Sequence, residues 1–239
     1  MPNKPSLLSI IVPCYQERHR LQACIDGLQR AVQAAALPTE IIVVDDGSTD
    51  GTATYAEELL APLKPPSKVL RTAHQGKGSA LQNGVSASRG DFVFLADADW
   101  SMPPEQIQRF LPPNAEDFSI AIANREHPES KRINEPFYRH ILGRGFNAFV
   151  QRMLLSGIED SQCGYKCLDG DFARTVFPKL QCKGWAFDVE LLFLARQSQA
   201  TILEVPIDWN FDSDSRIRPL RDAFQMARDV AAIRRRHLH

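Results

Sequence analysis

Two aspartates separated by one residue, Asp97 and Asp99, follow the apolar run 92–96 near the middle of the chain. On an extended segment the side chains of residues i and i+2 point to the same side, so both carboxylates can face one ligand. Carboxylate oxygens suit Mg²⁺ or Mn²⁺, and such sites often share the ion with substrate phosphates. Taken alone, the pair is better explained as a solvent-exposed turn. The metal interpretation therefore depends on what the other predicted strand ends carry.

Two other apolar runs also end in polar residues. The run 7–12 is followed by the segment 13–17, and the run 40–44 by the acidic, glycine-containing segment 45–50. Turn formation and capping of the next helix account for part of the segment 45–50. Two adjacent carboxylates directly after a strand, Asp45 and Asp46, must also stay near solvent or meet a donor, and a nucleobase imide N–H is such a donor. Both interpretations hold together.

The hydrophobic pattern of the first half predicts the sheet that would bring these residues together. Strands are predicted at 7–12, 40–44, 69–72, 92–96 and 118–123, and helices at 17–36, 52–60 and 78–88. Strands that are apolar on both faces and separated by single helices indicate a parallel sheet covered on both sides. We therefore predict an α/β fold with a doubly wound, mostly parallel sheet, whose ligands bind beyond the carboxyl ends of the strands.

The second half has a less regular pattern. The polar, proline-bounded segment 125–136 is predicted as a mobile loop, and apolar residues recur at helical spacing over 138–156. A loop at 160–167, a helix at 187–196, a strand at 202–205 and a helix from 220 complete the chain. With no internal repeat and no linker, residues 1–239 are predicted to form a single domain.

Composition excludes several classes of protein. The 239 residues are 44% hydrophobic and 24% charged, which excludes collagen-like and wholly disordered chains. No apolar run approaches the roughly 18 residues of a membrane helix, and the polar N-terminus lacks the apolar region of a secretory signal. We therefore expect a cytoplasmic protein, and nucleic acid is not an expected partner. Five scattered cysteines fit reduced thiols better than disulfides or a metal site.

Charge is divided unevenly between the halves of the chain. Residues 1–124 carry a net charge of −4 and residues 125–239 carry +3, although the whole chain has only −1. An acidic first half suits a divalent cation, and a basic second half suits an anionic partner. Chance produces differences of this size in many solvated surfaces, so the asymmetry alone decides little.

Four ordered segments resemble a known family: Ile11–Glu17, Val43–Asp50, Gly76–Gly78 and Leu95–Asp99. In this order and at these separations they resemble the family 2 glycosyltransferases, which have the GT-A fold. Two further segments, Asp160–Lys166 and Trp185–Leu192, are similar to the branch of polyprenyl-phosphate glycosyltransferases that includes the dolichyl-phosphate β-glucosyltransferases. The resemblance covers about residues 7–235. It implies a metal-dependent, inverting transfer of a hexose, glucose in this branch, from a UDP-sugar to a polyprenyl phosphate.

The resemblance also implies donor-site roles within about residues 1–124. Residues expected to line the nucleoside and sugar-diphosphate pocket are Pro13, Tyr15, Glu17, Asp45, Asp46, Lys77 and Ala98. Asp45 would take the base imide, Lys77 would approach the diphosphate, and the metal, Mg²⁺ or Mn²⁺, would be held by Asp97 and Asp99.

Three residues of the acceptor-side half, about 125–239, correspond to catalytic positions of the family. Arg125 and Arg139 match arginines near the lipid phosphate, which a guanidinium can hold bidentately. Asp160 matches the base of relatives that use a hydroxyl acceptor. A phosphomonoester, with a second pKa of about 6, is already ionised at neutral pH. We therefore expect Asp160 to position substrate, with base catalysis secondary.

Two other functions fit the same residues. One is a family 2 transferase acting on a soluble hydroxyl acceptor with Asp160 as base, and the other is a nucleotide-sugar-binding protein without catalysis. For a lipid acceptor, the stretch 138–156 and the basic cluster Arg234–Arg236 are the candidates for peripheral contact with the cytoplasmic face of a membrane. Amphipathic helices more often simply cover a core.

Overall fold

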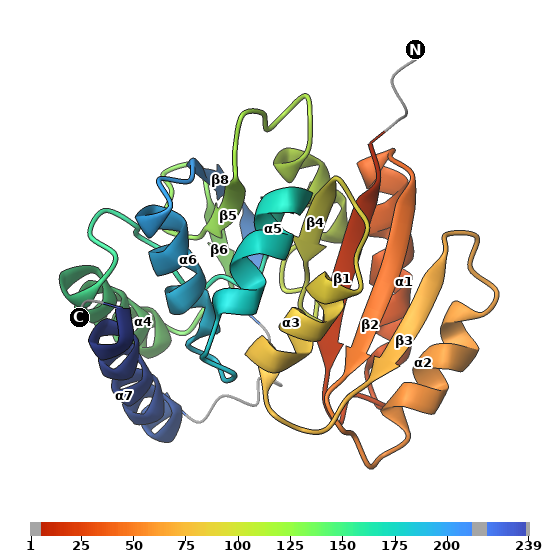
Figure 1. The fold of residues 1–239 in the computed structure, drawn as a ribbon, viewed down its shortest axis with the longest axis horizontal. Coiled ribbons are helices and arrows are strands. Elements are labelled where there is room, and N and C mark those ends of the chain that lie inside the picture. Colours follow the sequence, from red (N-terminus) through yellow and green to blue (C-terminus); the bar gives the residue numbers. More distant parts are fainter. Residues whose placement is uncertain (1–5, 212–218, 238–239) are drawn as a thin grey trace.

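The computed structural model describes residues 6–211 and 219–237. Seven strands form one sheet in the spatial order β3-β2-β1-β4-β7-β5-β8 (Figure 1). Their bounds are β1 (Leu8–Cys14), β2 (Thr39–Asp45), β3 (Ser67–Arg71), β4 (Phe92–Leu95), β5 (Ile120–Asn124), β7 (Lys166–Asp169) and β8 (Ile202–Pro206). Within this sheet only β7 runs antiparallel to its neighbours β4 and β5. The predicted mostly parallel α/β fold is therefore confirmed.

Helices cover both faces of the sheet (Figure 1). They are α1 (Leu21–Ala35), α2 (Thr52–Leu60), α3 (Lys77–Ser86), α4 (Phe137–Met153), α5 (Gly170–Val176), α6 (Phe187–Gln197) and α7 (Pro219–His237), with short 3-10 helices η1 (Pro104–Phe110) and η2 (Phe177–Lys179). Ile11 packs into one apolar cluster with α3 and α6, whereas its neighbours Ile10 and Val12 pack into a second with α1 and η1. Because alternate side chains enter two cores, the strand reads as a continuous apolar run.

Two segments predicted as loops contain strands. The segment 125–136, predicted to be mobile, includes β6 (Lys131–Ile133), which pairs in parallel with β9 (Asp208–Asn210). The segment predicted as a loop at 160–167 ends in β7, a central strand of the sheet. The rest of both segments is loop, as predicted. The strands were missed because they are only three or four residues long and begin with a charged lysine. Pattern analysis needs a longer apolar run to identify a strand.

The strand register aligns the carboxyl ends of β1, β2 and β4, which we call the strand-end rim. Cys14 lies beside Asp45, and Ile11 lies beside Leu95. The backbone continues this alignment past the strands, because Asp46 N–H donates to the Cys14 carbonyl at 2.8 Å and Ala96 N–H to the Ile11 carbonyl at 3.0 Å. The residues that follow these strands therefore meet at one edge, as expected.

Close contact between α3 and β1 predicts a sensitive position. A Cβ added at Gly84 would lie 2.4 Å from Ile11 Cγ2, whereas one at Gly143 would have nothing within 4 Å. Gly84→Val should lower the free energy of unfolding by about 3 kcal/mol through overpacking. Gly143→Val, in an open part of α4, should change it by less than about 0.5 kcal/mol, because the two residues differ little in helix propensity. Urea denaturation of both variants tests this, and equal effects would contradict the packing account.

Candidate functional site

An aromatic pair marks one end of the strand-end rim. The ring of Tyr15, which is exposed, stacks on His74 with centroids 4.0 Å apart and planes 17° from parallel. An exposed aromatic face is a surface on which a nucleobase can stack. His74 was not predicted from the sequence. It follows the third predicted strand, whose end lies at the same edge of the sheet.

Asp45 and Asp46 have different environments although both are buried. Asp45 Oδ2 accepts the Ser48 N–H at 3.1 Å, but its Oδ1 is buried without a hydrogen-bond partner. Both Asp46 oxygens are used: they accept the N–H groups of Gln75 and Gly76 at 3.0 and 2.8 Å. Because a buried acceptor without a donor is costly, Asp45 is suited to a donor from a ligand, whereas Asp46 fixes the loop that leads into α3.

Pro13 and Glu17 lie on either side of Tyr15. Pro13 belongs to β1 and is aligned with Val44 of β2. Glu17 lies 2.6 Å from the Nε of Arg20, and its N–H donates to Thr52 Oγ1 at 2.9 Å. Glu17 therefore holds the connection between β1 and α1 against the start of α2.

Lys77 is the first residue of α3, and its Nζ lies 2.5 Å from Asp97 Oδ1. Burial alone would lower the pKa of Lys77, but the negative charges of Asp97 and Asp188 outweigh burial and raise it. Lys77 is therefore a permanent cation at neutral pH, next to the predicted metal ligands. The structure brings together the predicted diphosphate residue and the acidic pair.

The acidic pair is held in a constrained turn. Desolvation of its carboxyl group and the negative charge of Asp97 raise the pKa of Asp99. The two carboxylates on either side of Ala98 repel each other. The next residue, Trp100, has a left-handed backbone with φ of 47°, and its Nε1–H donates to the Cys24 carbonyl of α1 at 2.9 Å. Trp100 thereby anchors the turn to a helix. Backbone strain of this kind is often found at functional sites.

The donor set fits a divalent cation shared with a substrate. No cluster of three or more His, Cys, Asp or Glu suitable for a metal occurs among residues 6–211 and 219–237. Two carboxylates would leave most of the coordination of a bound Mg²⁺ or Mn²⁺ to phosphate oxygens and water, as is usual for Mg²⁺. A third protein ligand is therefore not required.

Two further charges lie behind the acidic pair. Lys166, at the start of β7, is completely buried, and its Nζ lies 2.7 Å from Asp188 Oδ1 at the start of α6. Burial raises the pKa of Asp188, while the charges of Lys166 and Lys77 act in the opposite direction. Asp97, Lys77, Asp188 and Lys166 therefore alternate in charge, each next to an opposite charge. Lys166 was given no role from the sequence, although it is the last residue of the segment Asp160–Lys166 that resembles the family.

Arg125 and Asp160 form a bidentate pair. Arg125 Nε and Nη2 donate to the two Asp160 oxygens at 2.7 and 2.8 Å, and the Arg125 N–H adds a third hydrogen bond at 2.9 Å. Asp160 is fully buried. Burial alone would raise the pKa of Asp160, but Arg125 outweighs it and lowers the pKa. In this geometry Asp160 is not a free base: it holds Arg125 in place.

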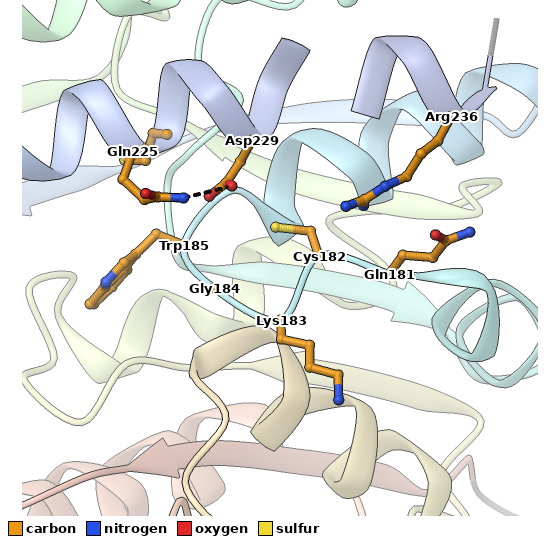
Figure 2. A pocket seen from close by; sticks show the side chains of 9 residues that line it. Gln181, Cys182, Lys183, Gly184, Trp185, Gln225, Asp229 and Arg236 are labelled. Carbon is orange, nitrogen blue, oxygen red and sulfur yellow. Dashed lines mark hydrogen bonds between the residues drawn. The ribbon is translucent and has the colours of Figure 1, made fainter. Parts of the chain in front are cut away.

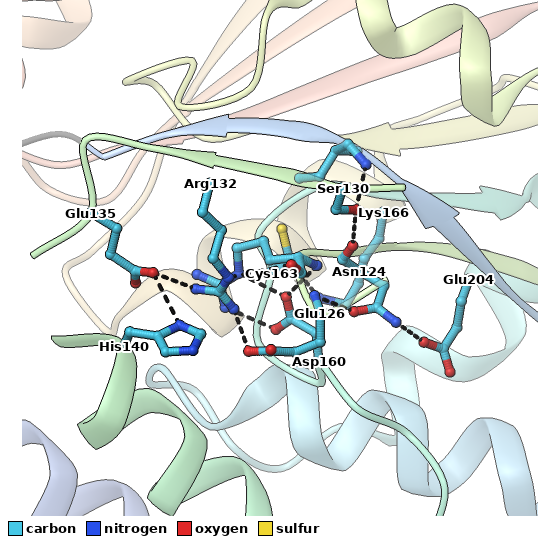
Figure 3. A network of polar contacts seen from close by, with 12 residues as sticks. Asn124, Glu126, Ser130, Arg132, Glu135, His140, Asp160, Cys163, Lys166 and Glu204 are labelled. Atoms are coloured by element: carbon cyan, nitrogen blue, oxygen red, sulfur yellow. Dashed lines mark hydrogen bonds and ion pairs between the residues drawn. The ribbon is translucent and has the colours of Figure 1, made fainter. Parts of the chain in front are cut away.

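A polar network connects this pair to α4 (Figure 3). Arg132 of β6 lies between Glu126 and Glu135, and its Nε donates to the Arg125 carbonyl at 3.3 Å. Glu135 also lies 3.3 Å from His140 Nδ1 in α4. Arg139 lies in the same helix, but its side chain is outside the part of the chain that the structure describes, so its role stays a prediction.

A loop next to Lys77 is fixed by a buried carboxylate. Glu190 accepts the N–H groups of Gln181 and Cys182 at 2.8 and 2.6 Å through one oxygen and lies 2.9 Å from His237 Nε2 through the other. The loop carries the half-exposed Trp185, whose ring centre is 5.4 Å from Lys77 Nζ. A cavity of about 320 Å³ separates this loop from α7 (Figure 2).

The Arg125–Asp160 pair predicts a pH-dependent loss of stability. Asp160→Asn should lower the free energy of unfolding by about 3–5 kcal/mol at neutral pH, because Arg125 loses its buried counter-charge. A carboxylate whose pKa is lowered in the folded protein stabilises the fold fully at pH values above its unfolded pKa, about 3.9. This contribution is lost as the pH falls through the folded pKa. In urea denaturation, the free energy of unfolding of the variant should therefore approach that of the wild type only below about pH 4.

Asp171→Asn provides the control, because Asp171 pairs with Arg174 at 2.9 Å on the exposed surface. An exposed pair contributes little, so this variant should match wild type across the range. An Asp160→Asn protein as stable as wild type at neutral pH would contradict the structural role of the pair.

Comparisons with known proteins identify the family of this chain. The family model described as Glycosyl transferase family 2 matches residues 9–173. A dolichyl-phosphate beta-glucosyltransferase of Dictyostelium discoideum is 35% identical, over 97% of this chain and 75% of its own length. The Mus musculus protein of the same name is 34% identical, over 97% of this chain and 76% of its own.

The fold is also that of a solved structure. Glucosyl-3-phosphoglycerate synthase of Mycobacterium tuberculosis, in complex with Mn²⁺, UDP and glucosyl-3-phosphoglycerate, has a TM-score of 0.66 at 20% identity, over 95% of this chain and 78% of its own. The resemblance drawn from the ordered sequence segments is confirmed. From the matched family model and the identity to these relatives over nearly its whole length, the chain belongs to glycosyl transferase family 2.

Proposed function

We propose that this protein transfers glucose, with inversion, from UDP-glucose to a polyprenyl phosphate of the dolichyl type. The observation that carries the proposal is the meeting of three features at the strand-end rim: the unpaired oxygen of Asp45, the cationic Lys77 and the acidic pair. The names of the relatives support the sugar and the lipid acceptor. Residues of about 1–124 would bind the donor, and residues of about 125–239 the acceptor.

The donor residues have complementary tasks in this proposal. Tyr15 and Asp45 would bind the base by stacking and by accepting its imide N–H. Lys77 would neutralise negative charge that develops on the departing diphosphate, which is the largest requirement when the glycosyl bond breaks. Asp97 and Asp99 would hold Mg²⁺ or Mn²⁺, and the bound ion would add electrostatic stabilisation of the same leaving group.

The acceptor-side geometry favours a phosphate over a hydroxyl. An ionised phosphomonoester needs no base, and Asp160 is buried with both oxygens bonded to Arg125. A hydroxyl acceptor would need a free carboxylate as general base, which accelerates such a reaction by about 10²–10⁴-fold. Arg125, positioned by Asp160, together with Arg139, would bind the acceptor phosphate.

We also propose a peripheral location at the cytoplasmic face of a membrane. No helix within 6–211 or 219–237 has both the length and the apolar character to cross a bilayer. The proposed acceptor is a membrane lipid, so the catalytic site must reach the surface of a bilayer for turnover.

The central experiment measures product formation. Purified protein with UDP-glucose, a short-chain polyprenyl phosphate and Mg²⁺ or Mn²⁺ should form the glucosyl lipid phosphate, and GDP-mannose or UDP-GlcNAc should react poorly. Asp97→Asn and Asp99→Asn should each reduce kcat by about a hundredfold, which corresponds to a loss of about 2.7 kcal/mol of charge stabilisation. Asp91→Asn is the control, because Asp91 lies at the opposite end of β4 and bonds the Leu7 N–H.

Three results would overturn the proposal. Product with a soluble hydroxyl acceptor but none with a polyprenyl phosphate would favour the alternative family 2 transferase. Donor binding without product from any acceptor would indicate a non-catalytic binding protein. Full activity after EDTA treatment would exclude the role of Asp97 and Asp99 in holding a metal.

Close contact between the loop before β7 and the acidic pair gives a separate prediction. A Cβ added at Gly164 would lie 1.9 Å from Asp97 Oδ2, so a side chain there must displace this carboxylate. Gly164→Ala should weaken Mn²⁺-dependent turnover by at least about tenfold, a change of about 1.4 kcal/mol in the barrier. Gly145→Ala, where a Cβ meets nothing within 4 Å, should retain activity. Steady-state kinetics against Mn²⁺ concentration measures both, and unchanged Gly164→Ala kinetics would show that Asp97 need not stay in place.

A further inference from the structure

Large apolar side chains are exposed together at the start of α4. Phe137 is 77% exposed, Tyr138, Ile141 and Leu142 are each at least half exposed, and Ile133 of β6 is also exposed. We call these five residues the α4 apolar face. Its helical members occupy positions i, i+1, i+4 and i+5, so they form one stripe on the helix. Contiguous exposed apolar surface of this kind usually marks an interaction site.

The fold itself does not need this stripe. Further along α4, Val150 is buried, and Phe146, Phe149 and Met153 pack against the apolar cluster that contains α6. The second half of the helix therefore covers the core, as amphipathic helices usually do. The first two turns extend past this core with their apolar side chains in solvent.

The charge of α4 indicates which partner would cover the face. The helix sequence carries Arg139, Arg144 and Arg152 and contains no Asp or Glu. Lys131, in the strand that carries Ile133, is exposed as well. A basic helix with an apolar stripe that includes aromatic residues has the composition of helices that lie in the interface of anionic membranes.

The C-terminal helix is a weaker candidate although it ends in the basic cluster Arg234–Arg236. Val230 and Ile233 of α7 are fully buried in the core. Arg234 Nη1 lies 3.4 Å from Met153 Sδ, and Arg236 Nη1 lies 3.9 Å from the buried Glu190. Val230 and Ile233 therefore cover the core, and two arginines of α7 contact the protein.

We infer that the α4 apolar face inserts into the interfacial layer of an anionic phospholipid bilayer. The choice of a lipid partner rests on the proposed function, because a polyprenyl acceptor is held in a bilayer. The face also lies next to the proposed phosphate-binding residue. Glu135 contacts His140 of α4 and Arg132, which in turn bonds the Arg125 carbonyl.

The test uses the whole protein and vesicles of phosphatidylcholine with phosphatidylglycerol. Phe137→Ser combined with Ile141→Ser should reduce co-flotation by more than about tenfold, because burial of one large apolar side chain alone contributes about that factor. Arg234→Gln combined with Arg235→Gln removes two exposed charges and should leave flotation within about twofold of wild type, because α4 supplies the insertion. Binding of UDP by calorimetry checks that both variants are folded.

Activity separates this inference from the proposed function. With a water-soluble, two-isoprene phosphate acceptor the α4 variant should match wild type, and with a long-chain acceptor in vesicles its turnover should fall by more than about tenfold. Vesicle binding by wild type and not by the variant supports the inference even if no acceptor yields product, a result that would refute the proposed function alone.

Several results would overturn the inference. Equal flotation of wild type and the α4 variant would exclude insertion through this face, and so would loss of flotation only in the arginine variant. Loss of turnover with the soluble acceptor would assign the face to the catalytic site. Gel filtration showing a wild-type dimer that the α4 substitutions disperse, without vesicle binding, would assign it to self-association.

Discussion

Pairing of buried charges is the constraint on which the site depends. Taking an ion out of water costs several kcal/mol, and a counter-charge with good hydrogen bonds must offset that cost. Here Lys77 pairs with Asp97, Lys166 with Asp188, and Arg125 with Asp160. Each pair joins segments far apart in the chain, so the pairs fix the geometry of the site as well as its charge.

The ion pairs lie within one half of the chain each, and close packing between the halves completes the site. The acidic pair follows β4, but the residues that contact or approach it come from α3 and from the loop before β7. β7 lies between β4 and β5 and runs against both. A strand entering from the opposite direction brings its preceding loop to the carboxyl end of β4. The antiparallel strand thus delivers Gly164 and Lys166 to a rim that is otherwise built from parallel strands.

The sequence predicted those parts of the fold that repeat a simple pattern. Long apolar runs identified β1, β2 and β4, and the rule that ligands bind beyond parallel strand ends placed Asp45 and Asp97 at one rim. Lys77 was added by the resemblance to the family. Pattern analysis missed β6, β7 and β9, whose three or four residues gain their stability from neighbours and not from their own pattern. It also left open whether Asp160 is free or paired, because a bidentate contact between residues 35 positions apart depends on tertiary packing.

The contact between Glu190 and His237 has a consequence for the handling of this chain. One carboxylate oxygen of Glu190 fixes the loop beside Lys77, and the other faces the last turn of α7. A protein cleaved before Arg236 would lose both Arg236 and His237, whose side chains lie near this oxygen, and would leave it buried without a hydrogen-bond donor from α7. Cleavage within α7 would therefore loosen the loop beside Lys77. Such a protein would lose activity although every residue proposed to bind the donor is still present.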